Sequence, residues 1–369
     1  MRLDRTRVEE LRARVEQEVE ARGLASCQYA LALDGDVLVS ETVGDAPADA
    51  RYVIFSCTKI LAVAVVWQLL GEGSLDSELP VTTWWREFGQ NGKDRITLEH
   101  VLAHTAGVPA GMVDPALFED RDGRAAQIAA WPLQWEPGSR FEYHAFSAHW
   151  ILAELIALIT RLDHRAAIRE RLLDPLGLPR LELGAAPDEQ DDVQPIVACG
   201  DQATWDEMAA ELGPELAERL APFILPMLDA PEIDPMDNPV FGPIVTPAGL
   251  AAGVPAANAV SDAASLALLY QALLHNGKGL WENSMLRGCR QTVVNRHPTP
   301  FGEPVMRGLG VEISGEGQPH ERARRIGSGF TSSSAFGHNG AAGRPAGPTR
   351  RRGCRSPSSP TDGIATPSE

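Results

Sequence analysis

The sequence predicts an α+β fold, in which both ends of the chain supply strands to one β-sheet and helices lie between them. Two short apolar runs, 29–33 and 37–39, flank an Asp-Gly-Asp turn at 34–36, which is the pattern of a β-hairpin. Residues 308–313 and 335–343 are short, apolar and rich in glycine, as expected of two further strands. Strands at both ends with helices in the middle favour a segregated arrangement over alternating βαβ units.

Helical patterns fill most of the region between the strands and also precede the hairpin. Residues 8–21 have the pattern of an amphipathic surface helix. Residues 60–70 are almost wholly apolar, which indicates a buried helix, and Gly71 marks its end. Further helices are expected at 96–103, 147–159 and 261–275. Ser261 is the expected N-cap of the last of these.

Composition excludes several classes of function. The 369 residues include 50 acidic and 33 basic side chains, a formal net charge of −17, which argues against nucleic acid as a partner. The longest apolar run is too short to span a bilayer, so no membrane partner is expected. The five cysteines are widely spaced, so neither a metal site nor a disulfide framework is indicated, and a cytoplasmic location fits best. No cofactor is expected, and the oligomeric state stays open.

Ser56 and Lys59 stand three residues apart at the start of the buried helix, so their side chains share one helix face. A serine hydroxyl attacks only when a neighbouring base takes its proton, and burial lowers the pKa of a lysine from its ordinary value of about 10.4 towards that of a usable base. Ser-x-x-Lys is a short pattern that often occurs by chance. This chain, however, has only three lysines, Lys59, Lys93 and Lys278, and only the first follows a serine at this spacing. The catalytic interpretation is therefore preferred.

Two further motifs, around Tyr143 and His338, could assist catalysis by Ser56 and Lys59. Tyr143 follows a Glu-Pro-Gly turn and precedes a helix, where a tyrosine usually serves packing but can relay a proton if Lys59 lowers its pKa. His338 lies in the glycine-rich run 336–343, where a ligand can approach the backbone closely and N–H groups can form half of an oxyanion hole. Each motif is weak evidence by itself, and the three in this order are more specific.

Together these motifs resemble the serine β-lactamase-like superfamily, and most closely the family VIII carboxylesterases, which are class C β-lactamase-like serine hydrolases. Four stretches carry the resemblance: Ser-Cys-Thr-Lys at 56–59, Leu-Ala-His-Thr-Ala-Gly-Val-Pro at 102–109, Trp-Glu-Pro-Gly at 135–138 with Tyr-His-Ala at 143–145, and Gly-His-Asn-Gly at 337–340. The resemblance implies a β-lactamase/transpeptidase-like fold, with an antiparallel sheet formed from both termini, flanking helices, and a mostly helical subdomain within about 75–255.

The resemblance also implies chemical roles for three side chains. Ser56 is expected to attack an ester carbonyl and become acylated, and Lys59 to accept its proton. Tyr143 is expected to act as partner base and then as acid towards the leaving alcohol. Which of Lys59 and Tyr143 is the principal base stays open, as it does among relatives. His104, in the second stretch, is expected to orient a loop.

The glycine-rich strand is expected to complete the site. By the same resemblance, the oxyanion would be held by the N–H groups of Ser56 and Ala341, with His338 and Gly340 beside the substrate. His338 stands where penicillin-recognising relatives carry the lysine of Lys-Thr-Gly, and it is neutral for much of the time near pH 7. Ala145 replaces the asparagine of Tyr-x-Asn and offers no hydrogen bond. Both changes favour a neutral ester over an anionic β-lactam.

The leading hypothesis is therefore a serine carboxylesterase that cleaves small, short-acyl, neutral esters. Two alternatives are kept. One is β-lactamase or D-amino-acid peptidase (amidase) activity in the same site. The other is a degenerate member that binds ligands without turning them over.

The resemblance ends at about Gly343. Residues 344–369 are rich in proline and arginine and show no apolar periodicity, which is typical of a disordered segment. The sequence therefore predicts a hydrolase domain over 1–343 and a disordered tail over 344–369 in place of further strands and a closing helix. The strand that carries His338 would then have an exposed edge. Residues 188–237, which are acidic and hold several prolines, are expected to form an insertion over one face, as a candidate lid.

Overall fold

The computed structural model describes two long stretches of the chain, residues 3–196 and 242–340. The second stretch has gaps at positions 296, 300, 301, 303, 304, 319–321, 323, 324 and 326–330. The strands 344–348 and 355–357 and the single positions 205, 206, 209 and 218 are described as well. Most of the candidate lid at 188–237 lies outside the described residues.

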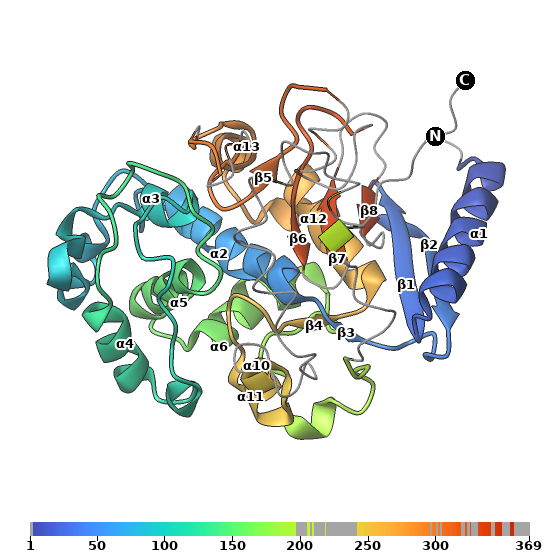
Figure 1. The fold of residues 1–369 in the computed structure, drawn as a ribbon, viewed down its shortest axis with the longest axis horizontal. Helices are drawn as coiled ribbons and strands as arrows, with labels where there is room; N and C mark the ends of the chain where they lie inside the picture. The colour runs from blue at the N-terminus through green and yellow to red at the C-terminus, as the bar shows by residue number, and fades with distance from the viewer. Residues whose placement is uncertain are drawn as a thin grey trace.

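A six-stranded antiparallel sheet joins distant parts of the sequence, in the order β2-β1-β8-β7-β6-β5 (Figure 1). Its strands are β1 (Ser26–Leu33), β2 (Asp36–Gly44), β5 (Glu312–Ile313), β6 (Phe336–Gly340), β7 (Arg344–Pro348) and β8 (Arg355–Pro357). The predicted α+β fold, with a sheet built from both ends, is confirmed. A separate two-stranded antiparallel sheet is formed by β3 (Tyr52–Val53) and β4 (Val260–Ser261).

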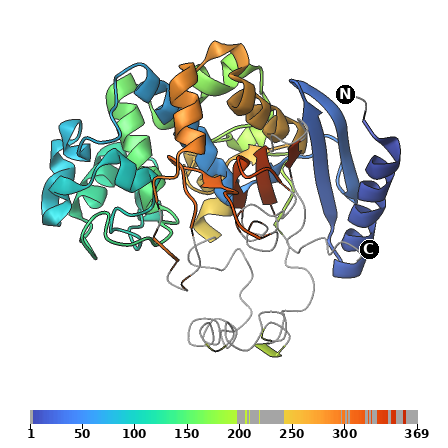
Figure 2. The same cartoon turned by 90° about the horizontal axis from the view of Figure 1, so that it is seen from above.

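The predicted hairpin forms because two residues in its turn adopt a left-handed backbone. Asp34 has φ 53° and Gly35 φ 93°, and Asp and Gly tolerate this region better than other residues. Helix α1 (Arg5–Arg22) covers one side of the hairpin at the margin of the molecule (Figure 2). On the other side, Gln271 binds both the N–H of Gly35 at 2.9 Å and the carbonyl of Ala32 at 2.8 Å. These bonds fix the hairpin to helix α12 (Ala263–His275).

Helix α2 (Lys59–Gly71) forms the centre of the core, and every residue from Lys59 to Leu70 is buried. The apolar run predicted this burial. The helix is entered through a 3-10 turn, η1 (Phe55–Thr58), so Ser56 lies just before the regular α-helix. Helix α5 (Ser147–Thr160), also apolar on nearly all sides, packs against α2.

The remaining helices surround this pair, and α3, α4 and α5 gather at one end of the molecule as a helical subdomain (Figures 1 and 2). The α-helices are α3 (Leu98–Leu102), α4 (Arg121–Ala130), α6 (His164–Ile168), α7 (Asp174–Leu176), α10 (Gly242–Val245), α11 (Pro247–Ala252) and α13 (Asn283–Gln291). Short 3-10 turns lie at Val81–Thr83, Arg86–Arg95, Pro115–Leu117, Pro187–Glu189 and Gly277–Gly279, and a π-turn lies at Arg169–Leu173.

Three predicted element boundaries need correction. Asp262 caps α12 by accepting a 2.7 Å hydrogen bond from the N–H of Ser265, whereas Ser261 belongs to β4. Helix α3 begins only at Leu98, because Thr97 caps it. In the predicted strand 308–313 only β5 is extended, since the chain first makes a tight turn around Gly310, whose φ is 88°.

The prediction of a disordered tail is wrong for the two segments that form β7 and β8. β7 pairs with β6, with His338 opposite Ala346, and β8 bridges to β1 through Ala32 and Arg355. β6 therefore has a neighbour on each side instead of an exposed edge. The physical reason is that the open edges of β1 and β6 offer backbone partners that outweigh a poor local strand propensity. The other residues of 344–369 lie outside the described residues.

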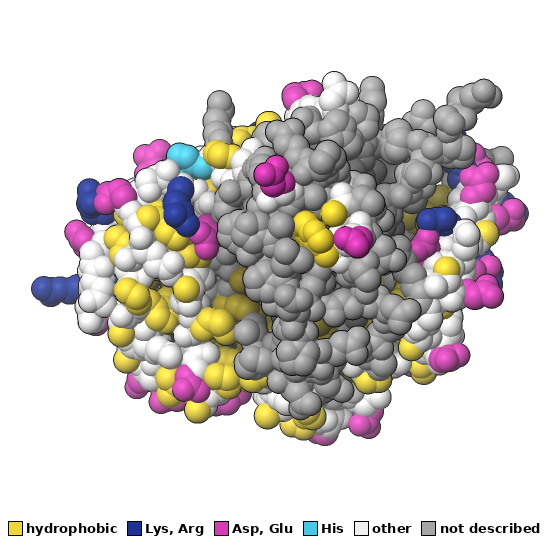
Figure 3. Space-filling view, viewed as in Figure 1, with side chains coloured by type: hydrophobic (Ala, Val, Ile, Leu, Met, Phe, Trp, Pro, Cys, Tyr) yellow, Lys and Arg dark blue, Asp and Glu magenta, His cyan; other side chains and the backbone are white. Residues whose placement is uncertain are grey.

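The described surface fits the charge balance of the sequence. In Figure 3, acidic and apolar side chains are dispersed over the described part of one face, and basic side chains lie at its left and right margins without forming a continuous patch. Among the described residues, no helix combines the length and the apolar character that a membrane span requires.

Candidate active site

Ser56, Lys59 and Tyr143 meet at one point, as the sequence predicted. The Lys59 Nζ donates to the Ser56 Oγ at 3.0 Å, and the Tyr143 hydroxyl donates to the same oxygen at 3.0 Å. A hydroxyl between a buried amine and a phenol has a proton acceptor and a proton donor within direct reach. The geometry therefore suits nucleophilic attack by Ser56.

The turn that presents Ser56 is strained and firmly anchored. Phe55 adopts φ 44°, a left-handed conformation that costs a bulky residue about 1–3 kcal/mol. Two hydrogen bonds tie the turn to the segment before β4: the Ile54 N–H donates to the Ala259 carbonyl at 2.9 Å, and the Thr58 Oγ1 accepts from the Ala259 N–H at 3.0 Å. Such strain next to a nucleophile is common in active sites, where surrounding bonds hold it in place.

Lys59 is buried, with 1% of its surface exposed, and makes one further hydrogen bond, to the carbonyl of Ala256 at 2.7 Å. Burial, and then the positive charge of Arg307, lower the pKa of Lys59 well below its ordinary value. A neutral amine keeps a lone pair for the proton of Ser56. The Ala256 carbonyl holds the amine in place, and the Ser56 hydroxyl lies within hydrogen-bond distance of it, so Lys59 is placed to act as a base.

The loop that carries Tyr143 is held by two histidines, His104 and His144, whose pKa values burial lowers so that both are neutral. The His144 N–H donates to the His104 Nδ1 at 3.1 Å, while the His144 ring accepts from the Val108 N–H at 3.1 Å and donates to the Glu142 carbonyl at 2.6 Å. His104 thus orients a loop, as predicted. Burial raises the pKa of the Tyr143 phenol, against the opposing effects of Ser56 and Arg307, so the phenol keeps its proton at neutral pH.

Strand β6 passes beside this group and carries His338 and Gly340. The His338 ring centroid lies 5.8 Å from that of Tyr143, and the His338 carbonyl accepts from the Cys57 thiol at 3.3 Å. Burial lowers the pKa of His338, and its Nδ1 donates to the Asn339 carbonyl at 2.7 Å, so the ring is neutral. Gly340 is buried at the end of the strand. Ala341, the predicted second oxyanion donor, lies outside the described residues.

Two groups at the candidate site, the Ala256 carbonyl and the Arg307 side chain, were not predicted from the sequence. Ala256 contributes only a backbone carbonyl, which no side-chain pattern reveals. Arg307 is 1% exposed, and its guanidinium carbon lies 5.5 Å from the centroid of the Tyr143 ring. In the sequence Arg307 is a single arginine directly before the glycine-rich run 308–313, and it belongs to no recognised motif that would indicate a functional role.

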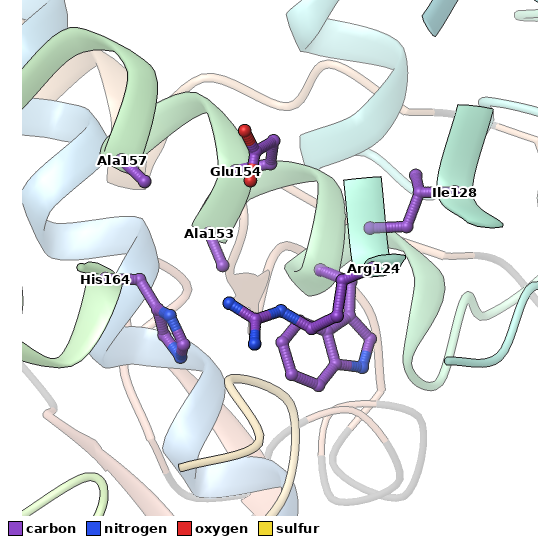
Figure 4. A pocket seen from close by; sticks show the side chains of 7 residues that line it. Arg124, Ile128, Ala153, Glu154, Ala157 and His164 are labelled. Atoms are coloured by element: carbon purple, nitrogen blue, oxygen red, sulfur yellow. The ribbon is translucent and has the colours of Figure 1, made fainter. Parts of the chain in front are cut away.

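A separate small cavity in the helical subdomain is structural. Figure 4 shows its lining, which consists of Arg124, Ile128, Trp150, Ala153, Glu154, Ala157 and His164. Its polar groups already have partners: Arg124 donates to the Phe118 carbonyl, Glu154 pairs with Arg121 at 2.7 Å, and His164 binds the Gly253 carbonyl at 2.8 Å. The cavity therefore offers a ligand few polar groups that are not already engaged.

Comparisons with known sequences identify the family of this chain. The family model described as Beta-lactamase matches residues 11–349. Esterase/beta-lactamase LipL of Mycobacterium tuberculosis is 32% identical over 147 residues, which cover 38% of this chain and 33% of LipL. Esterase EstB of Burkholderia gladioli is 25% identical over 190 residues, which cover 44% of this chain and 48% of EstB. The chain thus aligns with less than half the length of either relative.

Solved structures show the same fold at low sequence identity. A penicillin-binding protein homolog from Caulobacter crescentus matches with a TM-score of 0.72 at 24% identity, over 94% of this chain and 90% of that one. A family VIII carboxylesterase matches with 0.70 at 20%, over 94% and 89%. A D-stereospecific amidohydrolase from Streptomyces matches with 0.63 at 20%, over 94% and 93%. Because the family model spans nearly the whole described chain, this protein belongs to the Beta-lactamase family.

Proposed function

We propose that the protein is a serine carboxylesterase that cleaves small neutral esters through an acyl-enzyme on Ser56. One observation carries the proposal: Lys59 and Tyr143 both hydrogen-bond the Ser56 Oγ at 3.0 Å. Ester cleavage needs a base for the attacking hydroxyl and an acid for the leaving alcohol. Two such groups, one inclined to be neutral and the other protonated, supply both.

In acylation, the Ser56 oxygen attacks the ester carbonyl carbon while its proton passes to the neutral amine of Lys59. The oxyanion of the tetrahedral intermediate is stabilised by backbone N–H groups, among them that of Ser56 in the η1 turn. As the C–O bond breaks, the leaving alkoxide takes the proton of Tyr143, and the ammonium of Lys59 returns a proton to the phenolate. Water then attacks the acyl-enzyme by the reverse path and releases the carboxylic acid.

The preference for neutral esters rests on two positions. A β-lactam carries a side-chain amide and a carboxylate, and both need partners in the site. Ala145 offers no hydrogen bond to the amide, and the neutral ring of His338 offers no positive charge to the carboxylate. Each unpaired polar group costs about 1–3 kcal/mol of recognition. Of the two sequence relatives, EstB is named an esterase and LipL both an esterase and a β-lactamase, so the names support ester cleavage without separating it from lactam cleavage.

An apolar pocket lies beside the segments that hold the catalytic groups. It is lined by Met112, Val113, Pro115, Phe118, Phe146, Trp150, Pro243, Ile244 and Val254. Phe146 follows Tyr143 by three residues, and Val254 precedes Ala256 by two. We propose that this pocket receives the hydrocarbon part of the ester, because it presents apolar surface next to both segments.

The experiment compares hydrolysis of p-nitrophenyl butyrate by the protein and by Ser56→Ala, with a chromogenic cephalosporin as the second substrate. We expect rapid ester cleavage, weak cephalosporin turnover, and loss of both in the variant. Mass spectrometry should find the butyryl group on the Ser56 peptide after acid quenching. Unaltered hydrolysis by the Ser56→Ala variant would refute the mechanism, and faster cleavage of the cephalosporin would favour the lactamase alternative.

A further inference from the structure

Arg307 is a buried cation beside the proposed catalytic residues. One of its nitrogens donates to the Glu312 carboxylate at 2.9 Å, and the guanidinium carbon lies 5.5 Å from the Tyr143 ring centroid and 5.7 Å from that of Phe141. Within the described part of the chain, its Nε and Nη1 have no hydrogen-bond partner. A buried charge with two unpaired donors is costly, so its position calls for an explanation beyond packing.

The ring of Tyr143 is shared by two basic side chains. The Lys59 Nζ lies 5.2 Å from the ring centroid, nearly the same distance as the Arg307 guanidinium. An arginine stays protonated at every working pH, whereas a desolvated lysine can lose its proton. When two cations share a desolvated site, the group that can lose its proton is the one that does so.

We propose that Arg307 is a positioning residue whose fixed charge holds the amine of Lys59 in the neutral form that can accept the proton of Ser56. The proposal deepens the proposed function and rests on it for the role of Lys59 as base. The placement of the proton itself does not depend on which substrate is cleaved. Glu312 anchors the guanidinium and, by its opposite charge, limits its effect.

The other groups that face Lys59 do not supply such a charge. They come from four segments: Cys57 in η1, Tyr143 before α5, His149 in α5 and His338 in β6. Burial lowers the pKa of both histidines well below the usual value and raises that of Tyr143, so all three are neutral near pH 7. Among the described groups around the amine, the fixed positive charge is therefore that of Arg307, with Glu312 as its counter-ion.

The chain offers a direct measurement, because it has only three lysines. Protein labelled with ¹³C-lysine gives three ε-methylene signals, which single-lysine substitutions assign, and the pH dependence of each signal gives its pKa. Arg307→Met removes the charge and should raise the pKa of Lys59 by about one unit. Glu312→Gln keeps the hydrogen-bonding shape, removes the opposing charge, and should lower it. The signals of Lys93 and Lys278 should not move.

Arg124→Met is the matched control. Arg124 is also buried and its guanidinium carbon lies 5.3 Å from the centroid of the Trp150 ring, but it belongs to the helical subdomain cavity (Figure 4). Its removal should leave the Lys59 titration unchanged. Equal shifts in Arg124→Met and Arg307→Met would mean that loss of packing moves the titration, which would overturn the proposal.

The kinetic consequence is a shift of the acid limb of kcat/KM for p-nitrophenyl butyrate. In Arg307→Met the limb should move about one pH unit higher, which is a tenfold loss at acidic pH that disappears at alkaline pH. An unshifted Lys59 signal in folded Arg307→Met would refute the proposal. If that variant does not fold, the Glu312→Gln titration decides, and a shift upward or no shift refutes it. Absence of ester cleavage by the unaltered protein would refute the proposed function but not the effect of Arg307 on Lys59, since the lysine titration needs no substrate.

Discussion

Two buried lysines, Lys59 and Lys93, show how similar surroundings can serve different ends. Both are at most 1% exposed, and each amine lies over an aromatic ring, 5.2 Å from the centroid of Tyr143 and 5.4 Å from that of Phe88. The amine of Lys93 donates to three backbone carbonyls, of Gln90 at 2.8 Å, Ala129 at 2.7 Å and Trp131 at 2.6 Å. That of Lys59 has one carbonyl and one hydroxyl.

The difference lies in the acceptors. An ammonium has three N–H donors, and three carbonyls satisfy it completely, so Lys93 joins segments of the helical subdomain. A hydroxyl can accept or donate, so the Ser56 contact of Lys59 survives when the amine is neutral. Burial lowers the pKa of Lys93 to about 8, and burial together with Arg307 lowers that of Lys59 well below its ordinary value. The number and kind of hydrogen-bond partners, more than burial, distinguish a lysine that can act as a base from one that has a structural role.

Replacing each lysine by methionine should have its most unequal effect on kcat/KM. Lys59→Met removes the proposed base and should reduce kcat/KM for p-nitrophenyl butyrate about a thousandfold, within the range of general-base effects. Lys93→Met should keep kcat/KM within a factor of about three at a temperature where it is folded, since it touches no reacting atom. Comparable losses in both variants would remove the distinction.

Tyr143→Phe gives Lys59 the same type of ring that lies beneath Lys93, and should chiefly lower kcat. We expect a loss of about a hundredfold for an ethyl ester, whose alkoxide needs the phenol proton to leave. The loss should be much smaller for a p-nitrophenyl ester, because its leaving group needs no acid. Steady-state kinetics on the two esters test this, and a change in KM alone would reduce Tyr143 to a packing role.

Stability should move in the opposite sense to activity. Lys93→Met leaves three backbone carbonyls without their donor, two of them on the buried residues Ala129 and Trp131, and should lower the free energy of unfolding by about 2–4 kcal/mol. Lys59→Met removes the donor to the Ala256 carbonyl and one of the two donors to the Ser56 hydroxyl, which still accepts from Tyr143. It also removes a desolvated amine, so it should be neutral or stabilising by about 1 kcal/mol. Urea unfolding followed by circular dichroism gives both values. A Lys59→Met protein that is the less stable of the two would contradict this account.

The smallest effect concerns the pH dependence of stability. Lys93 has a pKa of about 8 when folded and about 10.4 when unfolded, so the unfolded chain binds more protons between these values. Its contribution to stability should therefore rise with pH from about 8 to 10, by about 2 kcal/mol. The difference in unfolding free energy between the protein and Lys93→Met, measured across this range, should grow. A constant difference would show that the three carbonyls cancel the effect of burial on the pKa.

The sequence predicted the parts of the site that local patterns encode. Ser56 and Lys59 lie on one helix, so their spacing alone brings them together, and Tyr143 could be added from the order of the motifs. Arg307 and Ala256 reach Lys59 only through tertiary packing, which no spacing reveals. The three carbonyl partners of Lys93 escaped for the same reason, since backbone groups carry no signature in the sequence.

The fold shows the same division. The hairpin turn, the buried helix and the helix from Ser147 follow from local periodicity and turn residues, and the structure confirms them. Strands β7 and β8 were missed because their proline and arginine content disfavours a strand locally, whereas the edges of β1 and β6 supply non-local partners. Asp262 displaced Ser261 as helix cap because the chain is still extended at Ser261, in β4.

The order of the sheet has a consequence for the time course of folding. Ala32 in β1 pairs with Arg355 in β8, so this contact closes a loop of nearly the whole chain, and the entropy of closure must be met before the pairing is gained. Helices α2 to α5, which contact one another within a shorter stretch, can collapse earlier. Refolding should therefore produce an intermediate with a native-like helical signal in which Ser56 and Lys59 already stand together. Strand β6 would join afterwards, so catalytic competence should lag behind helix formation.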